Sequence, residues 1–225
     1  MSLQQNKTAK SILLNMLLAF VSLFINGFGV YLTINANIGA GPWDVFNLGL
    51  SKTFGILYGN ASIAVSFAVL MIDIAMHEPI GIAMFIDAVT VGKTVDLFNY
   101  LEFVRAPDTL AAAIVMLLVG LTIMGYTQFL YMRASLGCGP RDTLLVGLKR
   151  HCRKLSIGAI SVIILSVVTL IGYLLGGPVG IGTLMCAFVT GPIMQLCFHT
   201  LNFDATQIQH QRLHVSLAIL LKRPV

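Results

Sequence analysis

The sequence has little charge. Asp, Glu, Lys and Arg make up 10% of its 225 residues, whereas 57% are hydrophobic and the mean hydropathy is +0.88. Soluble domains carry roughly 25% charged residues, so a globular water-soluble fold is excluded, because too few charges remain to cover its surface. The apolar residues must face a lipid bilayer. The net charge of +5 does not indicate a nucleic-acid partner, since basic residues beside membrane segments usually record topology.

The sequence also lacks the common motifs of metal and catalytic sites. Its four cysteines form no C-x-x-C pair, so we expect neither a disulfide nor a metal site. His210 and His214 are four residues apart without further ligands nearby, which favours a solvated tail over a metal site. H-E-x-x-H and G-x-S-x-G patterns are missing as well. We therefore expect no enzyme activity, no cofactor and no bound metal.

Long stretches without charge predict about six transmembrane helices, at roughly 20 residues a span. No Asp, Glu, Lys or Arg occurs between Lys10 and Asp44, which is too long for a signal peptide and indicates an uncleaved first helix. The predicted spans are Ser11–Leu32, Gly59–Met76, Ile80–Tyr100, a fourth between Asp108 and Arg133, and two within Leu155–Phe203 divided by Gly176-Gly177-Pro178.

The distribution of basic residues predicts that both termini are cytoplasmic. With the N-terminus inside, the outer loops hold only Lys52 and Arg105. The inner segments hold Lys7, Lys10, Arg133, Arg141, Lys149, Arg150, Arg153, Lys154, Arg212, Lys222 and Arg223.

An internal repeat is the most informative feature. Ile38–Leu50 aligns with Leu136–Leu148, and a second block, from Pro79 to Gly92, aligns with Pro178 to Gly191. Identical pairs in the first block are Gly39/Gly137, Gly41/Gly139, Pro42/Pro140, Asp44/Asp142, Gly49/Gly147 and Leu50/Leu148. The chain is thus predicted to be one all-α membrane domain, 1–225, with repeat 1 at about 11–100, repeat 2 at about 109–200 and a cytoplasmic tail at about 202–225.

Each repeat holds three predicted spans, so the second copy enters the membrane upside down. This places the first motif at the outer face and the second at the inner face. Inverted 3+3 repeats are a recurring transporter architecture with substrate sites near the midplane.

The paired G-x-G-P-x-D…G-L motifs, each followed by a P-x-G-I segment, resemble the YczE/YyaS/YitT family of bacterial integral membrane proteins. The likeness to its YczE branch covers about residues 11–200. The resemblance implies a multi-pass protein of the bacterial plasma membrane. It implies no catalytic residues and no particular chemistry.

Within each motif, the glycines allow a tight turn and the proline suits the first position of a helix. Asp44 and Asp142 then fall in the first turn, where a carboxylate interacts well with the helix dipole. One interpretation is a well-capped helix start. The other is that two helix ends, with Arg141, line a polar cavity and bind anionic groups, for which the two Asp side chains would compete. Short helices such as Trp43–Lys52 are too short to span.

The third span carries the charged groups Asp87, Lys93 and Asp96. Charges at bilayer depth are costly and usually face a bundle interior or a water-filled path, so these residues are candidates for binding a proton or substrate. Lys93 and Asp96 share a helix face and are expected to pair, although both could instead snorkel to the interface. Asp73, near the end of the second span, is expected to be solvated.

These patterns favour a small-solute transporter or exporter that rocks one repeat against the other. Asp87 would exchange a proton, and Lys93 and Asp96 would gate or bind substrate. The alternative is a non-transporting scaffold or subunit of a larger membrane complex. Possible partners beyond the bilayer are a small-molecule substrate, a second copy of the chain, or another membrane protein.

Overall fold

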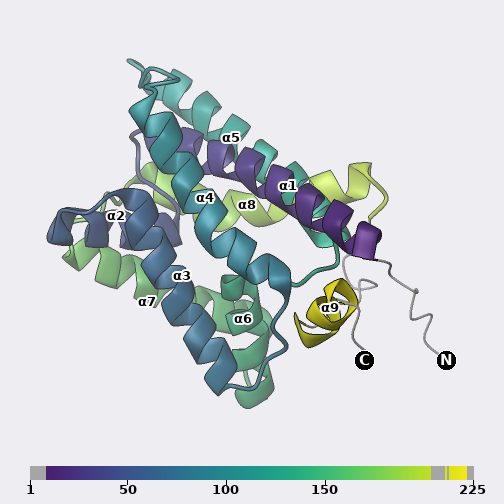
Figure 1. The fold of residues 1–225 in the computed structure, drawn as a ribbon. Coiled ribbons are helices and arrows are strands. Elements are labelled where there is room, and N and C mark those ends of the chain that lie inside the picture. Colours follow the sequence, from purple (N-terminus) through teal and green to yellow (C-terminus); the bar gives the residue numbers. More distant parts are fainter. Residues whose placement is uncertain (1–8, 204–210, 212, 222–225) are drawn as a thin grey trace.

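The apolar stretches become long helices in the computed structural model, which describes residues 9–203, 211 and 213–221. The predicted all-α fold is confirmed, since the described residues form helices and no strand. Figure 1 labels α1 (Ala9–Asn35), α2 (Pro42–Phe54), α3 (Tyr58–Ala75), α4 (Ile82–Tyr100), α5 (Leu110–Arg133), α6 (Pro140–His151), α7 (Ile157–Leu174), α8 (Ile181–Thr200) and α9 (Leu213–Leu220).

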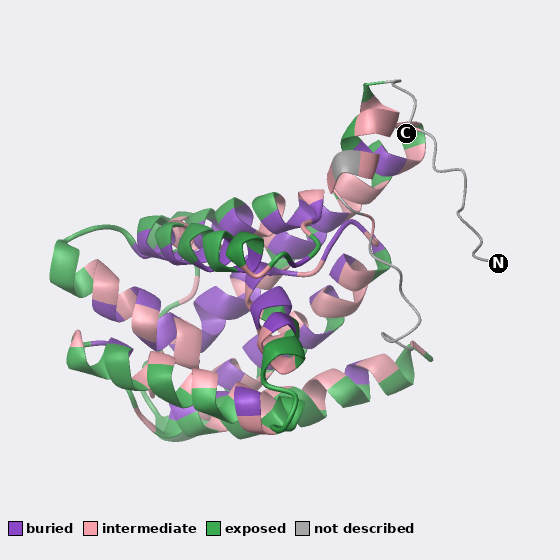
Figure 2. Ribbon diagram, turned by 90° about the horizontal axis from the view of Figure 1, so that it is seen from below, coloured by how far each residue is buried: buried purple, intermediate pink, exposed green. Residues whose placement is uncertain are grey.

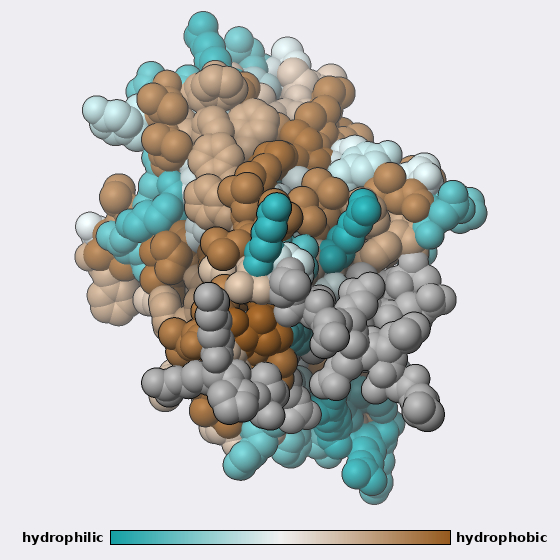
Figure 3. All heavy atoms as spheres, turned by 45° about the vertical axis from the view of Figure 1, so that its right-hand side comes forward, coloured by the Kyte–Doolittle hydropathy of each residue, from teal (hydrophilic) through white to brown (hydrophobic). Residues whose placement is uncertain are grey.

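Within the described residues, five helices are long and apolar enough to cross a membrane: α1, α3, α5, α7 and α8. Helix α4 has the length of a span but carries Asp87, Lys93 and Asp96. Large apolar side chains lie exposed along these helices, and in Figure 2 exposed and buried residues alternate along them. Figure 3 shows an extended apolar area across the face it displays. The chain is therefore a membrane protein with transmembrane helices.

Helices α1 to α8 form two groups. Helices α1, α4, α5 and α8 pack side by side in one group, and α2, α3, α6 and α7 pack in the other, with α3 also lying along α4 (Figure 1). Within the second group, α2 packs mainly on α7 and α6 mainly on α3. Each short helix thus packs against a helix from the other half of the chain.

The two short helices begin as the motifs predict. Gly41 and Gly139 are the N-caps, and Pro42 and Pro140 occupy the first turn. A missing proline N–H costs nothing at that position. Before each cap, Gly39 and Gly137 adopt φ values of 107° and 130°, a left-handed region that glycine enters without steric cost. The turn chemistry inferred from the sequence is confirmed.

Each motif is hydrogen-bonded to the opposite half of the chain. The Gly182 amide donates to the Ile38 carbonyl at 2.7 Å, and the Ala83 amide donates to the Leu136 carbonyl at 3.2 Å. Ile38 aligns with Leu136, and Ala83 aligns with Gly182. The same contact therefore occurs twice, with the roles of the halves exchanged.

After α8, the short helix α9 packs on α1. The Leu213 amide donates to the Ile80 carbonyl at 2.7 Å, which holds the start of α9 beside the start of α4. Much of the predicted tail, including His210, Arg212, Lys222 and Arg223, lies outside the described residues, as does Lys7. The side chain of His214 is likewise not described.

Candidate functional site

The starts of α2 and α6 meet inside the protein. The guanidinium carbon of Arg141 lies 5.0 Å from the centre of the Trp43 ring, within the range of a cation–π interaction. The sequence analysis expected the two motifs at opposite faces of the membrane, and it did not foresee that the first residues of their helices are in contact. The membrane face that each motif approaches stays a prediction. Arg141, which the sequence analysis grouped with the basic residues of the inner segments, faces Trp43 and lines a cavity.

The equivalent carboxylates of the two motifs have different surroundings. Asp44 is buried, and its Oδ1 accepts a hydrogen bond from the Tyr58 hydroxyl at 2.7 Å. Asp142 is exposed, and its Oδ2 accepts a hydrogen bond from the Gln128 amide at 3.3 Å. The residue aligned with Tyr58 is Ile157, which has no hydroxyl. One motif carboxylate is thus enclosed and the other is open.

Asp87 reaches the start of α6 from α4. A Cβ atom placed on Gly139 would lie 2.7 Å from Asp87 Oδ2, so the glycine leaves the space that the carboxylate fills. The aligned residue in the second half is Cys186, whose Cβ lies beside Gly41 at the start of α2. Asp87 and Arg141 are therefore charges without a counterpart, since the aligned residues Cys186 and Trp43 are uncharged.

A polar cavity of about 330 Å³ lies in front of these groups. Trp43 and Ile164 line one side of it. Its polar lining comprises Asn26, Asp87, Gln128, Arg141, Asp142, Ser161 and Thr190, from helices α1 and α4 to α8. The structure thus gathers Asp87, Arg141 and Asp142 of the predicted site residues around one space, with Asp44 buried nearby.

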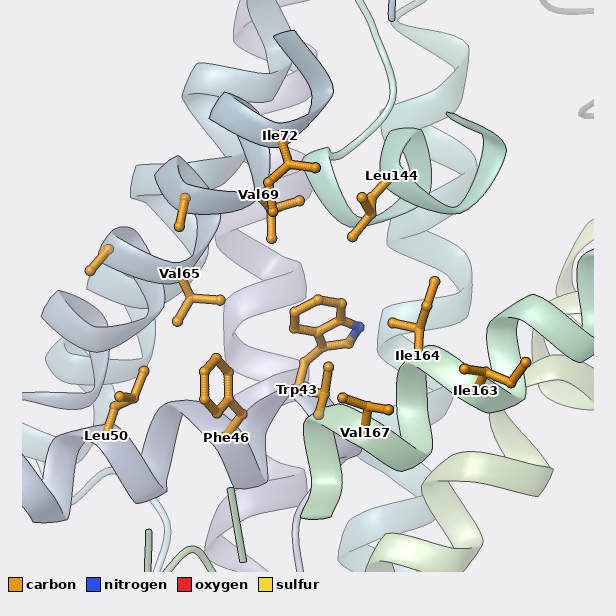
Figure 4. A pocket seen from close by; sticks show the side chains of 13 residues that line it. Trp43, Phe46, Leu50, Val65, Val69, Ile72, Leu144, Ile163, Ile164 and Val167 are labelled. Atoms are coloured by element: carbon orange, nitrogen blue, oxygen red, sulfur yellow. The ribbon is translucent and has the colours of Figure 1, made fainter. Parts of the chain in front are cut away.

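An apolar groove of about 530 Å³ lies on the other side of Trp43. Figure 4 shows the indole of Trp43 standing between Val65 and Val69 of α3 and Val167 of α7. The groove shares Trp43 and Ile164 with the polar cavity. These two side chains separate an apolar space from a charged one.

Lys93 and Asp96 lie elsewhere, where α3 meets α4. Asp96 Oδ1 accepts a hydrogen bond from the Gly59 amide at 2.8 Å, and Lys93 Nζ donates to Asn60 Oδ1 at 2.7 Å. The expected pair between them is present but long, at 3.9 Å. These residues fasten two helices together and do not line the polar cavity.

Comparison with known proteins places the chain in a family. A family of unknown function, DUF6198, matches residues 13–199. The chain belongs to DUF6198. It is 29% identical to the uncharacterized membrane protein YczE of Bacillus subtilis over 78% of this chain and 81% of that protein. It is 28% identical to an uncharacterized protein of Haemophilus influenzae, over 77% of this chain and 78% of that protein.

A third relative, the uncharacterized protein YyaS of Bacillus subtilis, is 24% identical over 78% of this chain and 88% of that protein. No solved structure matches the chain. The family resemblance drawn from the paired motifs is confirmed. Because these relatives are uncharacterized, the chemistry of this DUF6198 protein has to be inferred from its own geometry.

Sequence reasoning missed part of the site of this DUF6198 protein. Tyr58, Gln128 and Tyr131 stand in charge-free stretches, where no pattern separates a polar group that faces a carboxylate from one that faces lipid. Asp73 was expected to be solvated, which is wrong. Its side chain is fully buried, and neither carboxylate oxygen has a hydrogen-bond partner within the described part of the chain.

Proposed function

We propose that this protein is a small-solute transporter or exporter of the bacterial plasma membrane, a carrier and not an enzyme. In this proposal α4 is the sixth span, the two halves form a 3+3 inverted repeat, and both termini are cytoplasmic. The charges on α4 are compatible with a span, because intramembrane ionisable groups face bundle interiors and water-filled paths. Asp87 lies beside Gly139 at the start of α6. Asp96 accepts a hydrogen bond from the Gly59 amide of α3.

The inverted repeat is supported by aligned elements and by reciprocal contacts. Helix α3 aligns with α7, and α4 with α8, each from its first residue. The paired hydrogen bonds of Ile38 with Gly182 and of Leu136 with Ala83 are those expected of a pseudo-two-fold axis. Such an axis in the membrane plane is typical of secondary transporters.

One observation carries the proposal: equivalent helix pairs are packed in one half and apart in the other. A Cβ placed on Gly92 would lie 3.0 Å from the Cα of Gly59, so α3 and α4 touch at these glycines. The aligned residues Gly158 and Gly191 have nothing within 4 Å of such a Cβ in the described part of the chain. Helices α7 and α8 accordingly make almost no contact, although α3 packs along α4.

This difference is what alternating access requires. The observed conformation is closed between α3 and α4, and the polar cavity is lined from the separated α7 and α8. In the opposite conformation Gly158 would meet Gly191, while Gly59 and Gly92 would part. Asp96 and Lys93 hold the closed pair. Pro192 interrupts the hydrogen bonding of α8, which provides a point for bending.

The test is disulfide trapping in native membranes. In a background without the four native cysteines, the pairs G59C/G92C and G158C/G191C are each exposed to mild oxidant. Both pairs should cross-link, since each is in contact in one of two exchanging conformations, although the cysteines of G59C/G92C must push the tightly packed α3 and α4 slightly apart to do so. A disulfide requires Cα atoms within about 7 Å, so the second pair reacts only if α7 and α8 close.

Flux provides the functional readout. Proteoliposomes containing the G158C/G191C variant are tested with a panel of cationic, anionic and neutral solutes, before oxidation, after oxidation and after reduction. Any flux should stop on oxidation and return on reduction. The single variants G158C and G191C serve as matched controls. If only G59C/G92C cross-links and no solute moves, the protein is a static membrane scaffold or subunit.

A further inference from the structure

Counted with every carboxylate ionised, the charges around the polar cavity do not balance. Each helix N-terminus carries about half a positive charge, so the starts of α2 and α6 partly offset Asp44 and Asp142. Arg141 neutralises the remainder. Asp87 then leaves the site with about one negative charge in excess.

A single added positive charge would restore neutrality. A net charge is costly to keep in a bundle surrounded by lipid, so the site favours a ligand of charge +1 over an anion or a divalent cation. Tyr131 is not part of the cavity wall, but its buried hydroxyl, which has no hydrogen-bond partner among the described residues, is close enough to Asp87 and Asp142 to interact with them electrostatically.

We propose that the polar cavity binds one monovalent organic cation in exchange for one proton carried by Asp87, which deepens and rests on the transport function proposed above. When the cation enters, the O–H bond of the Asp87 carboxyl breaks, the proton passes to water, and the carboxylate pairs with the cation. When the cation leaves, the carboxylate takes up a proton. One positive charge occupies the site in either case.

The walls favour an organic cation over a metal ion. Met124, Leu145, Ile164, Leu165 and Met194 provide apolar surface for the carbon groups of an organic cation, whereas the Trp43 ring is already covered by the Arg141 guanidinium. The apolar groove continues beyond Trp43 and Ile164. A volume of about 330 Å³ lies at the lower end of small-molecule pockets, which span roughly 300–1,000 Å³.

We assign the exchanged proton to Asp87 because the described residues provide no hydrogen bond to this carboxylate. Asp142 and Arg141 of α6 and Tyr131 of α5 act on it electrostatically. On α3, Tyr58 is bonded to Asp44, and Asp73 interacts with Glu78. On α1, Tyr31 donates to the Val104 carbonyl at 3.0 Å. Asp44 and Asp142 already accept hydrogen bonds.

Trp43 is the single tryptophan of the chain, so the tryptophan fluorescence reports on the polar cavity and the apolar groove that adjoins it. The full-length protein in detergent is titrated with tetrapropylammonium chloride, which does not absorb at the excitation wavelength. We expect saturable binding that tightens by about tenfold per pH unit while Asp87 titrates, because each bound cation releases one proton. Sodium butanesulfonate, an apolar anion, should produce no saturable change.

Three variants sharpen the test. Asp87→Asn should weaken tetrapropylammonium binding at least tenfold and remove its pH dependence. Asp87→Glu should keep the wild-type affinity and its pH dependence. Asp108→Asn, in the exposed loop before α5, is the matched control and should bind as the wild type does. Should Asp87→Asn fail to fold, the pH dependence of the wild type and of Asp87→Glu decides.

The cation site is overturned if wild-type affinity is independent of pH, or if butanesulfonate binds and tetrapropylammonium does not. These outcomes are separable from those of disulfide trapping. If G158C/G191C cross-links and the flux is independent of pH, the protein is a transporter that does not exchange a proton. Proton-linked binding without cross-linking of G158C/G191C would keep the site and remove the transport.

Discussion

At the residue scale, the same residue types have different roles according to their neighbours. Asp44 and Asp142 occupy equivalent positions, yet one is enclosed under the Tyr58 hydroxyl and the other opens on a cavity. Asp87 and Asp96 stand on one helix, yet one faces the start of α6 and the other accepts a backbone amide of α3. The position of a carboxylate in this sequence therefore does not reveal its surroundings or its partner.

Asp73 is a residue whose substitution should stabilise the protein. At pH 8, folding must either bury this carboxylate as an unpaired charge or load it with a proton, and both cost free energy. Asp73→Asn removes the charge at nearly constant shape. We expect the free energy of unfolding to rise by at least about 1 kcal/mol, or about 2–4 °C in melting temperature, in detergent at pH 8.

The gain should shrink at pH 4, where the wild-type carboxylate is protonated in the folded and much of the unfolded state. Asp108→Asn, which changes an exposed carboxylate, is the control and should melt as the wild type does. An equal or lower melting temperature for Asp73→Asn at pH 8 would mean that this carboxylate has a stabilising partner.

At the element scale, glycine positions determine which helices approach closely. Gly92→Ala places a methyl group 3.0 Å from the backbone of Gly59 and 3.2 Å from Ser62 Cβ. Overpacking of this kind typically costs about 1–3 kcal/mol. Gly191→Ala adds its methyl group to open space and should gain up to about 1 kcal/mol from helix propensity. Melting temperatures of the two purified variants compare these effects directly.

Equal destabilisation by both substitutions would indicate that α7 and α8 are packed in the resting protein, contrary to the observed conformation. Gly59→Ala offers a third measurement on the closed pair. Its Cβ would meet the Gly92 carbonyl and Asp96, so it should behave like Gly92→Ala.

Most helices could be predicted from the sequence, because a bilayer imposes length and apolarity on each span. The span predicted at Gly59–Met76 is helix α3, Tyr58–Ala75, and the two spans expected after Leu155 are α7 and α8. The start of α2 followed from local rules for proline and glycine. The direction of α2 could not be predicted in this way, because the backbone torsions of the turn before Pro42 decide whether a short helix points inward or lies at the surface.

At the scale of the whole molecule, long-range contacts were the least predictable. Trp43 and Arg141 fill the variable position of each motif, and nothing in their local sequence indicates that they stack. Conversely, the positions of Lys93 and Asp96 on α4 were known, but the amide and side chain that hold them belong to α3. Such pairings follow from how the halves dock, which a single sequence does not specify.

The proposed inverted topology has a direct test in cysteine labelling of intact cells. Cys152, after α6, is exposed, whereas Cys186 and Cys197 are buried. We expect an impermeant maleimide to leave Cys152 unmodified until the inner face is opened. A cysteine introduced at Gly55, after α2, should be modified from outside. Modification of both positions from the same face would contradict the inverted repeat.

The reciprocal hydrogen bonds between each motif loop and the opposite half have an evolutionary consequence. The Ile38 carbonyl accepts a hydrogen bond from α8, and the Leu136 carbonyl accepts one from the start of α4. Neither half therefore satisfies the backbone hydrogen bonds of its own motif loop. A half-length ancestor with this geometry would have left these carbonyls without partners as a monomer. In the proposed inverted topology a second copy, inserted in the opposite orientation, would have satisfied them, and gene fusion would then have allowed each copy to change its charges independently.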